Sequence, residues 1–155
     1  MITINLNDIR EVVEVTIGDH VYNVRRMGSG EELDLSASNR RTFEAMDKAV
    51  KLQKKFTELS STPEEELDQK EVDKLVKQMD KVTAEIRNEQ EYQAEAFVKL
   101  FDDGKDGSKS RELLKSFSHD EKQKLLEQIF SQKEVLDASK ANDDENGLES
   151  VSDDE

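Results

Sequence analysis

The side chains best suited to chemistry in this sequence are the carboxylates of residues 102–107, which read DDGKDG. Asp and Gly at this density are ingredients of an EF-hand calcium loop, in which ligands stand at fixed positions. A loop that starts at Asp102 would have Gly104 third, Lys109 eighth and Leu113 twelfth, where an oxygen ligand, an apolar residue and Glu are required. The segment is therefore predicted to be a turn and not a calcium site.

The other candidate chemical groups are equally isolated. His20 and His119 lie far apart in the sequence without a His-Glu-x-x-His motif, so both are expected to be lone surface side chains. Residues 28–30 lack the third glycine and the lysine of a phosphate-binding loop, and Glu31 and Glu32 would repel phosphate, so this segment is interpreted as a hinge. The chain has no Cys, which excludes thiolate metal sites and thiol nucleophiles. We expect no enzymatic activity, no metal and no cofactor.

Composition and charge narrow the class of protein. Of the 155 residues, 34% are hydrophobic and 39% are charged, which supplies a thin core. The net charge of −14 divides into −1 over residues 1–60, −6 over residues 61–136 and −7 over residues 137–155. Such a chain repels phosphate backbones, so no nucleic-acid partner is expected, whereas a basic protein would be attracted. Without a membrane-length apolar run or a signal peptide, the sequence predicts a soluble, intracellular protein with no membrane partner.

The beginning of the chain has the alternation of β-structure. Residues 2–6, 13–17 and 21–24 alternate apolar with polar side chains, and Gly18-Asp19 lies between the last two runs. A Gly-Asp pair in that position predicts a hairpin turn. We predict a three-stranded antiparallel sheet over residues 1–27, which needs a helix over its apolar face.

Helical periodicity begins after residue 30. A helix is predicted from Glu31 to about Leu59, opened by a capping box of Ser29 and Glu32, with weak helix formers at residues 36–39 that favour a break. Its apolar stripe is formed by Ala45, Ala49, Leu52, Phe56 and Leu59, flanked by Phe43, Met46 and Val50. This helix is the candidate to cover the sheet.

A second long helix is predicted from Pro63 to about Phe101, with Thr62 and Glu65 as its capping box. Its seam residues are spaced by three and four: Val72, Leu75, Met79, Val82 and Ile86. The pattern stops because the next seam positions hold Glu89 and Gln93. A short pairing within the chain is favoured over a long dimeric coiled coil, which needs about 3–4 heptads.

The last part is predicted to hold a short helix at residues 111–117, a helix opened by Ser118 and Glu121 that reaches about Leu136, and a disordered acidic tail at residues 137–155. The fold class is therefore α+β, a small N-terminal antiparallel sheet followed by a mainly helical part. The expected domains are residues 1–60, the helical residues 61–136 and the tail.

Large apolar side chains are concentrated in these C-terminal helices: Phe97, Leu100, Phe101, Leu113, Leu114, Phe117, Leu125, Ile129 and Phe130. Two interpretations stay open. The nine residues could line a groove that binds a helical segment of a partner. They could also be the minimal core of a small bundle.

Residues 17–27 read IGDHVYNVRRM and residues 28–33 read GSGEEL. In this pattern, which covers roughly residues 10–60, the chain resembles tail assembly chaperones of long-tailed bacteriophages and prophages of Gram-positive bacteria. Those proteins begin with a β-hairpin of the form Ile-Gly-x-x-x-Tyr-x-Val-Arg, pass through a hinge into a helix that opens with Glu, and finish helical. Similar length, the lack of Cys and a charged C-terminus agree with the resemblance.

The resemblance implies a non-enzymatic protein of the host cytoplasm that is absent from the finished virion. It would bind the tape measure protein, a very long helical chain, keep it soluble and help to recruit tail tube subunits. An alternative from another class is an acidic regulatory inhibitor that competes for a basic site on a nucleic-acid-binding protein. Salt separates the two, since electrostatic mimicry weakens with ionic strength and apolar groove binding does not.

Overall fold

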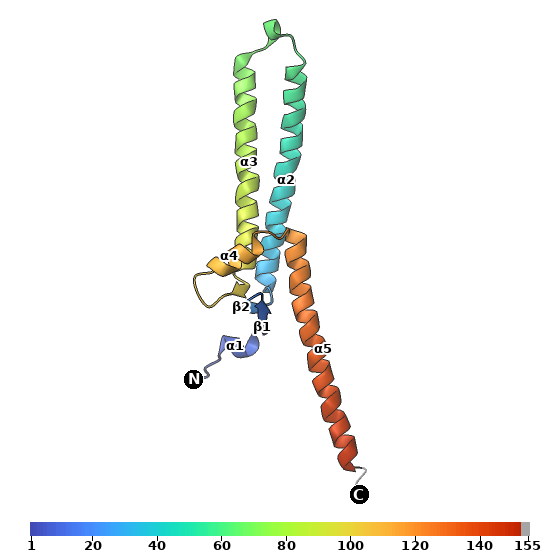
Figure 1. The fold of residues 1–155 in the computed structure, drawn as a ribbon. Helices are drawn as coiled ribbons and strands as arrows, with labels where there is room; N and C mark the ends of the chain where they lie inside the picture. The colour runs from blue at the N-terminus through green and yellow to red at the C-terminus, as the bar shows by residue number, and fades with distance from the viewer. Residues whose placement is uncertain (153–155) are drawn as a thin grey trace. The chain divides into compact units, whose positions relative to one another are not determined.

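The structure is a computed structural model that describes the backbone of residues 1–152 and the side chains of residues 1–6 and 9–135. Its elements, in chain order, are α1 (Leu6–Ile9), β1 (Val12–Ile17), β2 (His20–Arg25), α2 (Ser29–Ser60), the 3-10 turn η1 (Glu64–Glu66), α3 (Gln69–Val98), β3 (Phe101–Asp102), α4 (Ser108–Leu114) and α5 (His119–Ser152) (Figure 1). The predicted α+β class, a small antiparallel sheet with a mainly helical remainder, is confirmed.

The chain forms two compact units. The sheet unit consists of Met1–Arg26 and Phe97–Glu155, and the hairpin unit consists of Met27–Ala96. The domain boundary expected at residue 60 falls inside the hairpin unit, in the connection between α2 and α3. The helix predicted to end near Leu136 continues as α5 to Ser152. The side chains of residues 136–155 and the backbone of residues 153–155 lie outside the described part of the chain, so disorder of the acidic tail at residues 137–155 stays a prediction.

The sheet is antiparallel, with the strand order β1-β2-β3. The predicted hairpin turn is confirmed: Gly18 adopts a φ of +64°, and Ile17 pairs with His20 across it. Tyr22 and Val24 of β2 are buried on one face, whereas Val21 is exposed, as the alternation requires.

The third strand is not the one that the sequence predicted. Residues 2–6 form no strand, because Ile2 and Ile4 find no partner and remain 88% and 64% exposed. Instead β3 pairs with β2, with Val24 opposite Phe101. Two residues directly after a long helix are too few for alternation to be visible in the sequence, so that strand could not be predicted from its pattern.

The helix that packs against the sheet is also different. The predicted covering helix, residues 31–59, belongs to the hairpin unit, while within the sheet unit α5 contacts β1. Arg26, just after β2, lies with its guanidinium carbon 4.5 Å from the centre of the Phe130 ring on α5. Its guanidinium also donates to Glu11 and, at 2.7 Å, to Glu134, and both ion pairs raise the pKa of Arg26. These contacts fasten the C-terminal helix to the strand ends.

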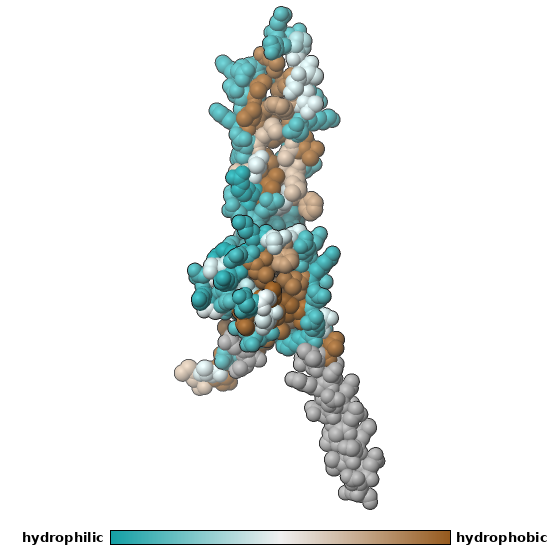
Figure 2. All heavy atoms as spheres, in the orientation of Figure 1, coloured by the Kyte–Doolittle hydropathy of each residue, from teal (hydrophilic) through white to brown (hydrophobic). Residues whose placement is uncertain are grey.

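The hairpin unit consists of α2 and α3, which run side by side in opposite directions (Figure 1). Hydrophobic side chains follow the line between the two helices (Figure 2). Leu35 and Ala45 of α2 and Leu75 and Val82 of α3 are buried. The predicted pairing within the chain is thus confirmed. The seam residues spaced by three and four on each helix meet those of the other.

The apolar pattern of the seam ends at Glu89 and Gln93, but the contacts between α2 and α3 continue there as hydrogen bonds. Glu89 accepts hydrogen bonds from the Ser38 hydroxyl at 2.6 Å and from Arg41 at 2.6 Å, and Gln93 donates to Ser38 at 3.0 Å and to Thr42 at 3.3 Å. Polar residues on one helix therefore face polar residues on the other, and this polar layer fixes the antiparallel register. It also explains why α2 continues through residues 36–39, where a break was favoured: Ser38 is fully buried and hydrogen-bonded.

The helix ends confirm one predicted capping box of three. Ser118 accepts the amide proton of Glu121 at 3.2 Å and opens α5 as expected. At α2 the cap is one residue earlier, since Glu31 accepts the Gly28 N–H at 3.2 Å. Thr62 opens no helix: its hydroxyl donates back to the carbonyl of Glu58, the end of α2.

Asp68 begins the next helix. Its carboxylate accepts the amide proton of Lys70 at 3.0 Å, so α3 starts at Gln69 instead of Pro63. Pro63 precedes the short turn η1, consistent with its fixed φ at the start of a helical turn.

Candidate functional site

The nine residues predicted to bind a partner lie mostly inside the sheet unit. Six of them are buried: Phe97, Leu100, Phe101, Leu114, Ile129 and Phe130. Together with Tyr22 and Val24 they form the core of that unit, which is the alternative that the sequence left open. Their side chains are not accessible in this structure, which favours the core interpretation for these six, and a partner groove there stays a prediction.

The remaining three, Leu113, Phe117 and Leu125, are half-buried at the surface of the same unit. Leu113 lines a cavity of about 310 Å³ beside the β1–β2 turn, together with Tyr22 and His20. The Tyr22 hydroxyl is 3.5 Å from the Lys109 carbonyl, and burial together with nearby carboxylates raises its pKa. These side chains are held by packing and backbone contacts, which favours a structural role for the cavity.

The sequence predicted that both histidines are lone surface side chains, and the structure shows that this is wrong. The His20 ring makes an edge contact with Tyr22, 4.8 Å between ring centres, and its Nε2 is 3.3 Å from the Asp103 carbonyl. The His119 ring contacts Phe97 in the same way at 5.4 Å. Both are half-buried supports of the core.

The loop at residues 102–107 is the predicted turn, and one carboxylate organises it. Asp103 is buried and accepts the backbone amide protons of Lys105, Gly107, Lys109 and Ser110 at 3.0, 3.2, 2.9 and 3.4 Å. Burial raises the pKa of Asp103, but these four donors outweigh it and leave the pKa below its usual value. The Asp103 carboxylate thus accepts hydrogen bonds from the backbone at the start of α4, which is a structural role.

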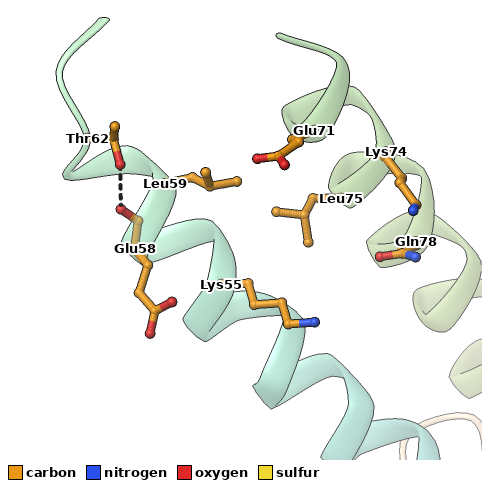
Figure 3. Close-up of a pocket in the computed structure, with 8 residues that line it drawn as sticks. All are labelled: Lys55, Glu58, Leu59, Thr62, Glu71, Lys74, Leu75 and Gln78. Atoms are coloured by element: carbon orange, nitrogen blue, oxygen red, sulfur yellow. Dashed lines mark hydrogen bonds between the residues drawn. The ribbon is translucent and has the colours of Figure 1, made fainter. Parts of the chain in front are cut away.

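Ligand-sized space that no core residue fills lies between the two helices of the hairpin unit. A cavity of about 440 Å³ is lined by Leu59 and Thr62 of the α2 end and by Leu75 and Gln78 of α3. Leu59 and Leu75 point toward one another across it, with Lys55 on the same side of α2 (Figure 3). This is an apolar floor with polar edges.

The space continues along the hairpin. A second cavity of about 340 Å³ has Leu52 and Val82 on its floor and shares Lys55 and Gln78 with the first. We call the two cavities together the hairpin groove.

A second apolar surface lies on α2 away from its seam. Phe43, Met46 and Val50 are 74%, 42% and 67% exposed, and their spacing of three and four places them on one face of the helix. The sequence did carry this signal, because these residues flank the seam stripe and the stripe alone is sufficient to pair α2 with α3. The hairpin unit therefore carries more accessible apolar surface than the C-terminal residues that were predicted.

The rest of the described chain offers no alternative centre. Within the residues that the structure describes, no group of three or more His, Asp or Glu side chains is placed to hold a metal ion. Over the same residues, none of the helices combines the length and the apolar character needed to cross a membrane. No protein-family model matches the chain, and comparison with curated proteins and with solved structures gives no match.

Proposed function

We propose that this protein is a non-enzymatic assembly chaperone that binds a long helical client, as the resemblance to phage tail assembly chaperones implies. The client would be a tape measure protein, with tail tube subunits recruited to the complex in the host cytoplasm. The observation that supports the proposal is the hairpin groove, an apolar seam between two helices that is left open at Leu59 and Leu75.

A groove between two antiparallel helices suits a third helix. An amphipathic client would place residues spaced by three and four over the half-buried Leu52 and Leu59, beside the buried Leu75 and Val82, and complete a three-helix arrangement. Burial of the client's own apolar side chains supplies most of the stability of such a complex and keeps an aggregation-prone helix in solution. The net charge of −14 keeps such complexes apart.

The test is co-expression with the phage-type genes that neighbour this gene, followed by affinity capture and washing at low and high salt. We expect a long helical tail protein to be retained through high salt. Leu59→Gln should weaken the retention, and its matched control is Val135→Gln, an exposed apolar position of α5 in the other unit. Circular dichroism of both variants checks that the helices persist.

The outcome separates the chaperone from the acidic inhibitor. Loss of every partner at high salt, or capture of a basic nucleic-acid-binding protein that needs residues 137–155, would overturn the chaperone and favour the inhibitor. Equal retention by both Gln variants would refute the hairpin groove as the client site.

A further inference from the structure

The middle of α2 has a charge opposite in sign to that of the whole protein. Residues 40–55 contain six basic side chains and two acidic ones, a net charge of +4 within a chain of −14. Three lysines of this stretch, Lys48, Lys51 and Lys55, line the hairpin groove. A local positive surface on a strongly acidic protein attracts anionic groups that the remainder of the surface repels.

Four lysines surround the second cavity of the groove. Lys48, Lys51 and Lys55 come from α2 and Lys81 from α3, around a floor of Leu52 and Val82. Two helices thus supply cations to one apolar site.

The opposing charges around this cavity are few. Glu85 is the acidic residue that lines it, and Lys51 Nζ lies 3.1 Å from Asp47 in an exposed pair that solvent screens. Among the described residues, Lys48, Lys55 and Lys81 have no ion-pair partner. These three cations are available to a ligand.

We propose that the hairpin groove binds an acidic amphipathic helix of the client, with apolar residues on Leu52 and Val82 and carboxylates against Lys48, Lys55 and Lys81. This inference rests on the proposed function and adds the chemical class of the segment recognised. The apolar floor favours a helix over a polyphosphate or nucleic-acid chain, which would leave Leu52 and Val82 uncovered. The net charge of the other surfaces opposes a nucleic acid as well.

The experiment measures binding of two synthetic peptides to the full chain by fluorescence anisotropy. Both peptides are amphipathic helices with Leu spaced by three and four; one carries Glu beside the Leu stripe and the other carries Lys at the same positions. We expect the Glu peptide to bind and to lose about tenfold in affinity at high ionic strength, which screens the lysines and leaves the apolar contacts that retain the client. The Lys peptide should not bind.

Two triple variants locate the site. Lys48→Gln, Lys55→Gln and Lys81→Gln together should weaken the Glu peptide about tenfold, since exposed charge pairs each contribute modestly. The matched control replaces Lys54, Lys70 and Lys77 by Gln, which changes the net charge equally on the same two helices but outside the cavity lining. Its affinity should stay within about twofold of the unchanged chain, because distant exposed charges are screened.

Equal binding of the two peptides, or equal loss in the two triple variants, would overturn the proposal. Binding that is detected only after removal of residues 137–155 would assign the groove to the chain's own acidic segment and overturn it too. Capture of a helical tail protein without Glu-peptide binding would refute this inference and leave the proposed function standing. Glu-peptide binding without capture of a helical tail protein would refute the proposed function and leave the groove's preference for an acidic helix standing.

Discussion

Replacing Glu89 by alanine should destabilise the hairpin unit selectively. The Ser38 hydroxyl is fully buried and donates to Glu89 at 2.6 Å, and a buried donor without an acceptor costs about 1–3 kcal/mol. The Arg41 side chain is 53% exposed, so its ion pair with Glu89 is screened by solvent and adds little. The expected loss is about 2 kcal/mol of the free energy that opens α2 and α3.

Hydrogen exchange followed by mass spectrometry measures that free energy region by region. A loss of about 2 kcal/mol corresponds to roughly 30-fold faster exchange of the protected α2 and α3 amides. Amides of β1, β2 and α4 in the sheet unit provide the internal reference. Glu89→Gln keeps an acceptor oxygen for Ser38 and should cost only about 0.5 kcal/mol.

Asp47→Ala is the matched control, because it removes an exposed carboxylate and its pair with Lys51 from the same hairpin. A surface change of this kind stays within about 0.5 kcal/mol. If Glu89→Ala and Asp47→Ala accelerate exchange equally, the polar layer does not hold the hairpin and the reasoning fails.

The same carboxylate gives a pH dependence with a definite sign. The hydrogen bonds from Arg41 and Ser38 lower the pKa of Glu89 in the folded chain. Its stabilising contribution is therefore complete above the unfolded pKa and is lost as the pH falls through the folded pKa. Exchange of α2 and α3 in the unchanged chain should accelerate on acidification, and Glu89→Gln should remove that part of the acceleration.

Three further predictions concern the sheet unit. Phe101→Ala should lower its free energy of unfolding by about 3–5 kcal/mol, measured by denaturation, because the ring is fully buried; an unchanged stability would restore Phe101 as a surface contact. Lys122→Met should raise it by about 1 kcal/mol, since burial lowers the pKa of Lys122 and disfavours its charge, and a loss of stability would refute this cost. The Asp103 pKa is lowered, so Asp103→Asn should lower the melting temperature at neutral pH and make it less dependent on pH in the acid range. An unchanged melting temperature would show that the turn does not need the charge.

Local pattern was sufficient for the β1–β2 hairpin and for the pairing of α2 with α3. Alternation with Gly18-Asp19 specifies the first, and spacing by three and four specifies the second. The pattern at residues 2–6 was equally regular and misled, because a strand also requires a partner edge. The partner of β2 is instead β3, which follows the hairpin unit in the sequence. Pairing between segments distant in sequence leaves no mark in either segment alone.

The site was harder to predict for a related reason. Apolar density in the C-terminal helices does not distinguish a core from a groove, and the core of the sheet unit required Phe97, Phe101 and Phe130 because the N-terminal strands are short. The hairpin groove is lined by Leu52, Leu59, Leu75 and Val82, residues that the sequence pattern assigned to helix pairing and not to a binding surface. The strongest apolar pattern in the sequence is that of the C-terminal helices, and most of those residues form the core of the sheet unit.

Different parts of the hairpin unit fix its register and form its proposed binding site. At one end, Ser38, Glu89 and Gln93 form a polar layer whose hydrogen bonds exist in a single register. At the other end, Leu59 and Leu75 line a cavity, and Leu59 is only half-buried. A client helix can therefore enter the apolar end and cover Leu59 without breaking the polar layer. Register then survives binding because the residues that set it are not the residues that bind.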